Sequence, residues 1–251
     1  MLRFLLSPRW IGLALFAGII ASVSVYLGNW QFDRRSERAA ENQLVISNLG
    51  KPPVALDSVV SPGGVFNSDA EWTPVQISGN YLSELEVTLK YQTRNSGAGV
   101  EVVTPLQTDS GAVVLVNRGW MPSSNTTAKP ENIEPATTGR VTVTGWLRRN
   151  STAEGQAIRV SEGQVRAISS VGLGEWVGKE MYPGFIDLYE QEPNIDSELK
   201  LRPDPDLSGG PHFFYALQWY FFAGLAIFGY FYFAWSEWKT IRGASRQSDQ
   251  I

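Results

Sequence analysis

Two long stretches without a charged residue, one near each end of the chain, limit what this sequence can fold into. The first covers residues 10–32 and the second covers residues 207–236. A helix needs roughly 20 apolar residues to cross the hydrocarbon core of a bilayer, so each stretch is long enough to do so. Aromatic residues, which favour the headgroup layer, make up 13 of the 23 residues in 213–235. The sequence therefore predicts transmembrane helices at 10–32 and 211–235.

A cleavable signal peptide is the alternative interpretation of the first stretch. The small residues Ala21 to Ser24 lie near its end, where a cleavage site would be expected. The apolar run is, however, longer than the usual signal core of about 7 to 15 residues. We therefore expect an anchor that is not removed.

The distribution of charge predicts an orientation. The short ends, residues 1–9 and 236–251, carry five Lys and Arg against two acidic residues, whereas residues 33–206 carry 16 against 23, a net charge of −7. Cations favour the cytoplasmic side, although Arg34, Arg35 and Arg38 directly after the first stretch weaken this signal. We expect a multi-pass protein of the cell membrane with both termini cytoplasmic and residues 33–210 outside the cytoplasm.

The outer segment begins with a helical pattern and then becomes rich in short β patterns. Residues 33–42 favour a helix, which we expect to continue the first one out of the bilayer, and allow Arg34–Glu37 and Arg38–Glu41 pairs. Beyond them, candidate strands separated by turn residues lie at 75–81, 86–93, 100–107, 112–117, 140–147, 165–169 and 185–189. Short strands with this punctuation predict a small barrel or a sandwich. The predicted fold class is thus α+β, with two membrane helices flanking a mostly β domain.

Two local patterns add detail to that domain. Ser110-Gly111 between two candidate strands is a hairpin signal. Only residues 171–180 look helical within the domain, and three glycines weaken the pattern.

The composition argues against several classes of function. The chain has no cysteine and one histidine, and it lacks a G-x-S-x-G motif, so disulfides, cysteine-held metals and common hydrolytic triads are not expected. The glycine pairs at 97–99 and 172–174 match no phosphate-binding motif. An acidic domain outside the membrane is an improbable partner for nucleic acid. We therefore expect a protein that is not an enzyme and binds no nucleic acid.

The single histidine, His212, lies at the start of the second apolar stretch. An imidazole at a membrane boundary is a ready axial ligand for a haem iron. The plainer alternative is that His212 only caps backbone groups or faces interfacial water. Position alone leaves both interpretations open.

Three strings in the chain resemble the surfeit locus protein one family of cytochrome c oxidase assembly factors. They are Leu27-Gly28-Asn29-Trp30-Gln31-Phe32-Asp33-Arg34, Val114 to Pro122 with Asn117-Arg118-Gly119-Trp120 in its centre, and Pro211-His212 through Tyr215-Ala216-Leu217-Gln218-Trp219. Their order and the two-helix layout extend over the whole chain. Between the strings, the resemblance is one of layout only.

The resemblance implies a role in oxidase assembly, as a chaperone that assists haem a insertion or stabilises the core subunit. It also makes His212 the best candidate ligand of a transiently bound haem a. The partner would be the oxidase core subunit or a respiratory supercomplex, together with membrane lipid. The alternative is an accessory protein that binds the mature oxidase or the supercomplex without contacting haem.

The residues around the three strings supply candidates for such a site. In a helix, His212, Tyr215, Ala216, Trp219 and Ala223 share one face, against which a flat macrocycle could lie, although membrane packing explains the same aromatic residues. We expect Trp30 and Gln31 at the level of His212, and Gln31 or another helix as the partner of Gln218. Arg118 could pair with a propionate or hold a turn, and Arg34 could contact lipid phosphate. The candidate site residues are His212, Tyr215, Trp219, Arg118, Trp30, Gln31, Arg34 and Gln218.

Small residues on the first helix predict where it packs. Ala14, Gly18 and Ser22 recur every four residues. This spacing allows close packing against the second helix of this chain or against a helix of the oxidase.

Overall fold

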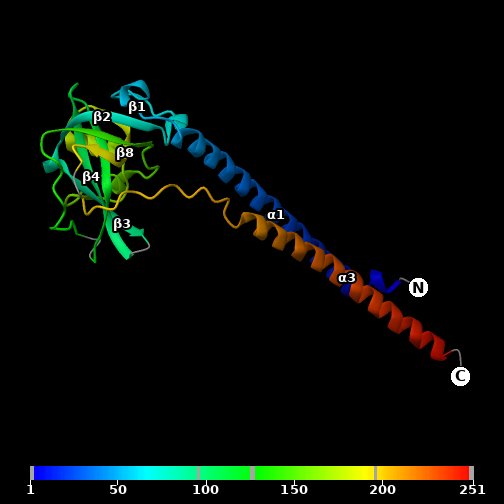
Figure 1. Ribbon diagram of the computed structural model, residues 1–251. Coiled ribbons are helices and arrows are strands. Elements are labelled where there is room, and N and C mark those ends of the chain that lie inside the picture. The colour runs from blue at the N-terminus through cyan, green and yellow to red at the C-terminus, as the bar shows by residue number, and fades with distance from the viewer. Residues whose placement is uncertain (1–2, 95–96, 125–127, 195–196, 249–251) are drawn as a thin grey trace. The chain divides into compact units, whose positions relative to one another are not determined.

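The structure is a computed structural model that describes residues 3–94, 97–124, 128–194 and 197–248. The chain forms two compact units, which we call the helical unit, residues 1–42 with 207–251, and the β domain, residues 43–206. Figure 1 shows two long helices in the first unit and a rounded β structure in the second.

The helical unit consists of a short 3₁₀ helix, η1 (Arg3–Leu6), and the long helices α1 (Pro8–Leu49) and α3 (His212–Ser248). Both long helices are long and apolar enough to cross a membrane. As predicted, α1 continues without a break through residues 33–42, and Arg34 pairs with Glu37 at 2.8 Å. The end of α1 belongs to the β domain, where Asn48 donates hydrogen bonds to the carbonyls of Asp69 and Glu71.

The packing face of α1 differs from the predicted one. Ala21, Ser24 and Gly28 are buried, whereas Gly18 and Ser22 are exposed and nothing lies within 4 Å of a Cβ placed at Gly18. Gly18 and Ser22 therefore do not pack within the helical unit, and their packing against a helix of the oxidase stays a prediction. Steps of four residues drift around a helix, whereas alternating steps of three and four, as from 21 to 24 to 28, stay on one face.

The β domain contains eight strands among the described residues. They are β1 (Val54–Ala55), β2 (Pro74–Tyr81), β3 (Val87–Arg94), β4 (Gly97–Thr108), β5 (Val113–Pro122), β6 (Arg140–Arg148), β7 (Gln164–Val165) and β8 (Met181–Glu192). The helix α2 (Ser170–Val177) and the 3₁₀ helices η2 (Leu56–Ser58), η3 (Ser68–Ala70), η4 (Ser83–Leu85) and η5 (Gly155–Ala157) connect them.

Five of these strands close into a small barrel. The pairs run β2–β6–β8–β5–β4, and β4 pairs back with β2 through Gly79 to Thr108 and its neighbours. The β5–β8 pair is parallel, while the other four pairs of the ring are antiparallel. The structure thus selects the barrel over the sandwich, with β3 and β7 extending from β4, and β1 from β2.

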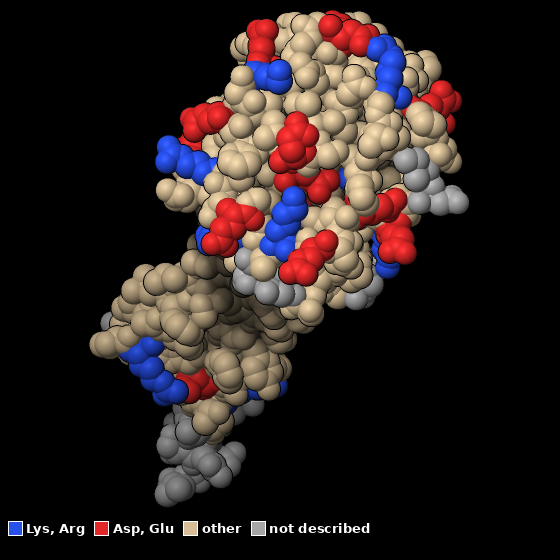
Figure 2. All heavy atoms as spheres, turned by 90° about the vertical axis from the view of Figure 1, so that its left-hand side faces the viewer, with Lys and Arg blue, Asp and Glu red and all other residues tan. Residues whose placement is uncertain are grey.

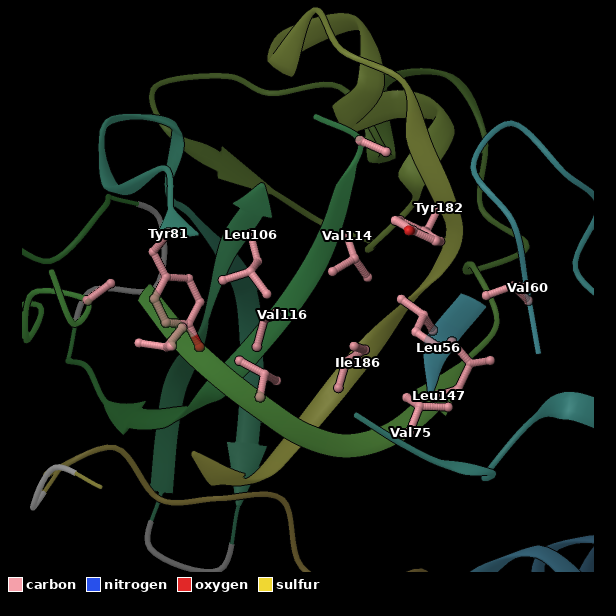
Figure 3. Close-up of a cluster of buried hydrophobic side chains, with 14 of the residues drawn as sticks. Leu56, Val60, Val75, Tyr81, Leu106, Val114, Val116, Leu147, Tyr182 and Ile186 are labelled. Carbon is pink, nitrogen blue, oxygen red and sulfur yellow. The ribbon is translucent and has the colours of Figure 1, made fainter. Parts of the chain in front are cut away.

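The core of the barrel is built by alternation along its strands. Val114 and Val116 point into the central cluster with Leu106, Leu147 and Ile186, as Figure 3 shows. Leu115, between the two valines, belongs instead to a second cluster with Val165, Ile168, Leu173 and Phe185. Successive residues of a strand face opposite sides, so β5 is buried on both faces.

Most predicted elements are confirmed, and the errors lie at one corner of the domain. The predicted strand at 165–169 is reduced to β7, because Ser169 caps α2 by accepting a hydrogen bond from the Gly172 amide at 3.4 Å. The helix predicted at 171–180 ends early, at Val177, because Gly178 adopts a left-handed conformation. The Ser110-Gly111 hairpin between β4 and β5 is present, with Gly111 at φ +87°.

Candidate functional site

His212 and Gln31 come together at the start of α3. His212 is the first residue of the helix, and its Nδ1 lies 2.8 Å from Oε1 of Gln31 on α1. With the amide oxygen as acceptor, Nδ1 carries the proton and Nε2 keeps its lone pair. No described residue forms a hydrogen bond with Nε2. The pair therefore orients the imidazole and leaves its second nitrogen available to a ligand.

The backbone before the helix keeps the space beside Nε2 open. Gly210 has φ +64°, and a Cβ placed there would lie 3.3 Å from Cδ2 and 3.6 Å from Nε2 of His212. Any side chain at this position would be strained in its backbone and would crowd the imidazole. Gly210 thus preserves access to the nitrogen that Gln31 leaves free.

Further contacts between α1 and α3 fix this arrangement. The Tyr220 hydroxyl donates to Oδ1 of Asn29 at 2.5 Å, and the Tyr220 ring lies against Gly28, where an added Cβ would be 3.1 Å from it. Phe32 contacts Phe213 and Tyr220, with ring centroids 6.3 and 6.1 Å apart. These contacts fix the position of α3 along α1 near His212.

Arg35 is a neighbour of the site that the sequence analysis missed. Its guanidinium carbon lies 5.0 Å from the centroid of the Phe213 ring, next to His212 in the chain. Arg35 follows Gln31 by four residues and therefore lies one turn further along the same face of α1. The four-residue spacing from Gln31 could have identified Arg35 as a neighbour of the site from the sequence alone.

The predicted aromatic face of α3 is only partly open. Ala216 and Ala223 are buried, so the small residues of that face pack within the helical unit and offer no open surface. Tyr215 is 49% exposed, and Trp219 is partly exposed beside Phe222. A flat ligand can therefore contact the edge formed by Tyr215 and Trp219, but not the alanines.

Three other predicted residues lie close to the same boundary with different partners. Trp30 is exposed, and Arg34 sits 5.8 Å from its ring while pairing with Glu37. Gln218 is exposed, and the Gln31 amide contacts His212 instead of Gln218. Of the two partners expected for Gln218, Gln31 is therefore wrong, and another helix stays a prediction.

Arg118 belongs to the β domain, where its guanidinium donates three hydrogen bonds. It donates to Glu86 Oε2 at 2.9 Å and to the carbonyls of Glu134 and Pro135 at 3.1 Å each. The side chain is buried and lies on the ring of Tyr81. Burial raises the pKa of Tyr81 far above its usual range, and the positive charge of Arg118 lowers it by less. Of the two roles expected for Arg118, these contacts fit the one in which it holds a turn.

The central string also carries a buried polar network that the sequence analysis did not anticipate. Asn117 donates to Glu101 Oε2 at 2.9 Å and to Asp187 Oδ1 at 2.8 Å. Arg148 and Arg202 pair with Asp187 at 2.8 and 3.3 Å. Burial raises the pKa of Asp187, while the two guanidinium groups and the Asn117 amide act in the opposite direction. The acids lie 16 and 70 residues from Asn117, so local spacing gave no signal.

The turn after Asn117 depends on a glycine. Gly119 has φ +140°, next to a register shift between β4 and β5. A Cβ there would lie 3.0 Å from the carbonyl oxygen of Lys200. The bulge lets Trp120 turn inward, where Arg94 and Lys200 lie over its ring at 5.6 and 5.4 Å.

Among the described residues, no group of three His, Cys, Asp or Glu side chains could hold a metal ion.

Comparison with known proteins places these features in a family. A sequence model of the SURF1 family matches residues 18–224. A SURF1-like protein of Mycobacterium bovis is 30% identical over 246 residues, which cover 96% of this chain and 89% of that protein, and a SURF1-like protein of Mycobacterium tuberculosis matches equally. The surfeit locus protein 1 of Xenopus tropicalis is 26% identical over 152 residues, 53% of this chain and 47% of that protein.

Proposed function

This chain belongs to the SURF1 family, a family of cytochrome c oxidase assembly factors, and from that premise we propose that it assists haem a insertion into, or stabilisation of, the oxidase core subunit. The role is a non-enzymatic one, in which haem a is held transiently by His212. The observation that carries the proposal is the oriented imidazole, with Nδ1 bound to Gln31 and Nε2 open beside Gly210.

The residues around His212 fit a haem held by one protein ligand. A neutral imidazole with its other nitrogen hydrogen-bonded is a usual iron ligand, because the second partner fixes the ring and its tautomer. Arg35 supplies a cation for a propionate, and Tyr215 and Trp219 supply ring surfaces. When bound, the haem itself supplies the iron that accepts the imidazole.

The limited enclosure of the site supports transient binding. Tyr215 is 49% exposed, and the small residues Ala216 and Ala223 are already covered. A ligand in this position would keep much of its surface open to the bilayer or to a partner. A carrier that must release its haem benefits from such a shallow site.

The test is the reduced-minus-oxidised spectrum of the full chain, co-expressed with the haem a pathway and purified in a mild detergent. We expect a haem a band in the wild type, its loss in His212→Ala, and weakening in Gln31→Ala and Gly210→Ala. Leu225→Ala, which shortens an exposed side chain further along the same helix, should keep the full band. Helical circular dichroism checks that each variant folds. A band of equal height in His212→Ala would exclude ligation by this residue.

A second candidate function rests on the outer face of α3. Phe214, Phe221 and Phe228 lie seven residues apart and are 74%, 62% and 65% exposed. Such a stripe suits a transmembrane helix of a partner, in line with an accessory protein bound to the mature oxidase or a respiratory supercomplex. No haem band in any variant, together with co-purification of oxidase that is unchanged in His212→Ala, would favour this role.

We also propose that α1 and α3 cross the cell membrane with both termini in the cytoplasm and the β domain outside. The positive excess at the two ends supports this orientation. A reporter fused after Ile251 should be active only in the cytoplasm. An externally active fusion would overturn the orientation.

A further inference from the structure

A pocket opens between the beginning of α1 and the end of α3, and we call it the end pocket. Residues within 9–16 of α1 and 233–240 of α3 line it, and its volume is about 560 Å³. This volume lies within the range of pockets that bind ligands in proteins. Both segments belong to the helical unit, and His212 lies at the other end of α3. The end pocket is therefore separate from the candidate haem site.

The lining of the end pocket changes from charged to apolar along the helices. Arg9 is the last charged residue before the first uncharged stretch, and Glu237 is the first charged residue after the second. Phe16 comes about 10 Å deeper than Arg9 along α1, from the rise of a helix. Phe233 comes about 6 Å deeper than Glu237 along α3. A ligand with a charged end and an apolar end would match this order.

The charged side chains of the helical unit gather in the same way. Figure 2 shows that most of the visible face of this unit is uncharged, with positive and negative side chains together near one end. The headgroup of a lipid lies next to its acyl chains in the same order. The position of the end pocket at this change from charged to uncharged surface therefore points to a lipid.

The polar groups of the end pocket have no partner in the part of the chain that the structure describes. Neither Arg9 nor Glu237 forms an ion pair or a side-chain hydrogen bond with another described residue. Trp10 lines the pocket and is 4% exposed, yet no described residue accepts a hydrogen bond from its indole N–H. A guanidinium and an indole N–H donate, whereas a carboxylate accepts. The end pocket thus offers donors on α1 and an acceptor on α3.

The apolar wall of the end pocket is open. Phe16 is 61% exposed and Phe233 is 58% exposed. Gly12 lies between the charged and the apolar levels, and nothing lies within 4 Å of a Cβ placed there. Trp10 is held by an edge-on contact with Tyr230, with ring centroids 5.8 Å apart. An acyl chain can therefore pass Gly12 and cover both phenylalanine rings.

We propose that the end pocket binds one phospholipid with a primary ammonium headgroup, as in phosphatidylethanolamine. The phosphate pairs with Arg9, the ammonium pairs with Glu237, and an acyl chain lies against Phe16 and Phe233. One cation and one carboxylate match a zwitterion, whereas an anionic headgroup would be repelled by Glu237. A primary ammonium also donates hydrogen bonds to a carboxylate, which the trimethylammonium group of phosphatidylcholine cannot do.

This inference rests on the proposed crossing of the membrane by α1 and α3, but not on haem or on which end is cytoplasmic. Retention of the chain in membranes washed with alkaline carbonate tests the crossing separately. A chain that is retained but shows no lipid preference would contradict the lipid site alone. The haem spectrum is independent of both results.

The experiment is native mass spectrometry of the full chain, released from a neutral detergent after separate titrations with three phospholipids of identical acyl chains. We expect one phosphatidylethanolamine to bind about tenfold more tightly than phosphatidylcholine or phosphatidylglycerol. Arg9→Gln should weaken its binding about fivefold. Glu237→Gln should reduce the preference over phosphatidylcholine to about twofold or less, and should strengthen the binding of phosphatidylglycerol because a repelling carboxylate is removed.

Two matched controls accompany these variants. Gly12→Phe fills the pocket and should weaken phosphatidylethanolamine about tenfold, whereas Gly18→Phe, in α1 but outside the pocket, should have little effect. Lys239→Gln removes a cation near the same end of the helical unit, from a side chain that lies 3.8 Å from the Trp235 ring. It should leave the affinity within about twofold. Helical circular dichroism checks that each variant folds.

Three results would overturn the proposal. Equal binding of phosphatidylethanolamine and phosphatidylcholine would mean that the headgroup is not recognised. Phosphatidylglycerol that binds as tightly as phosphatidylethanolamine would show a site for anionic lipids. Equal weakening by Gly12→Phe and Gly18→Phe would show that the lipid binds elsewhere on the helices.

Discussion

The interactions that stabilise the helical unit differ from those that stabilise the β domain. In the helical unit, small buried residues such as Ala21 and Ser24 allow close packing, and individual hydrogen bonds such as His212–Gln31 join α1 to α3. In the β domain, buried valines and leucines fill a closed barrel, beside an ionic network around Asp187. Water drives apolar burial in the domain, but lipid would offer no such force between α1 and α3 in the membrane that we propose they cross. The same substitution should therefore have different consequences in the two units.

The largest effect tests this difference with one chemical change in both units. Leu147→Ala, inside the barrel, should lower the free energy of unfolding of the β domain by about 2 to 5 kcal/mol, since it removes buried methyl groups and leaves a cavity. Leu217→Ala, on the exposed side of α3, should leave it unchanged. The measurement is denaturant unfolding of the full chain followed by the β-sheet circular dichroism. Equal losses of unfolding free energy in the two variants would contradict the difference between the two units.

A glycine pair tests the packing of the helices. Gly28→Val should destabilise the contact of α1 with α3 by about 1 to 3 kcal/mol, because the new side chain meets the Tyr220 ring. Gly18→Val is the control, since nothing lies within 4 Å of that position. Loss of helical circular dichroism during titration of sodium dodecyl sulfate into a mild detergent measures both. Indistinguishable titrations would contradict the observed packing face.

A double-mutant cycle sharpens the contribution of a single hydrogen bond. Asn29→Ala, Tyr220→Phe and the double variant should give a coupling energy of about 0.6 kcal/mol, the average for hydrogen bonds between membrane helices. The same detergent titration provides the three values. A coupling of zero would mean that ring packing, and not the hydrogen bond, determines this contact.

The smallest effect concerns an exposed ion pair. The hydrogen bond from Arg140, together with its charge, lowers the pKa of Asp109 below 3.8. The pair therefore adds stability above that ordinary value and loses it as the pH falls through the lowered pKa. Asp109→Asn should cause a slight destabilisation at pH 7 that disappears in stronger acid. Thermal unfolding of both proteins from pH 7 to strong acid measures it, and a difference that grows in acid would reverse the sign.

The sequence predicted the elements of the fold better than their arrangement. Charge-free length was sufficient to place α1 and α3, and alternation with turn residues located most of the strands. The barrel closure between β2 and β4, and the parallel β5–β8 pair, depend on contacts between distant segments. No local pattern carries that information, so barrel and sandwich remained equal alternatives.

The candidate site was predictable in part for the same reason. Resemblance and helical level placed Gln31 near His212, and the two residues are hydrogen-bonded. The prediction of an open face around Ala216 was wrong, because the way α1 packs determines which side of α3 is covered. Arg118 is committed to Glu86, a partner 32 residues away that no motif linked to it.

The position of Asn117 has a chemical consequence for the lifetime of the protein. Its side-chain nitrogen serves two carboxylates at once, Glu101 and Asp187. Deamidation would replace that nitrogen by oxygen and place a third carboxyl group beside Glu101 and Asp187. One hydrolysed amide would thus convert the centre of the network from a bridge into a repulsion. The amide of Asn117, at a position that is 2% exposed, is therefore the group that keeps Glu101 and Asp187 joined in one network.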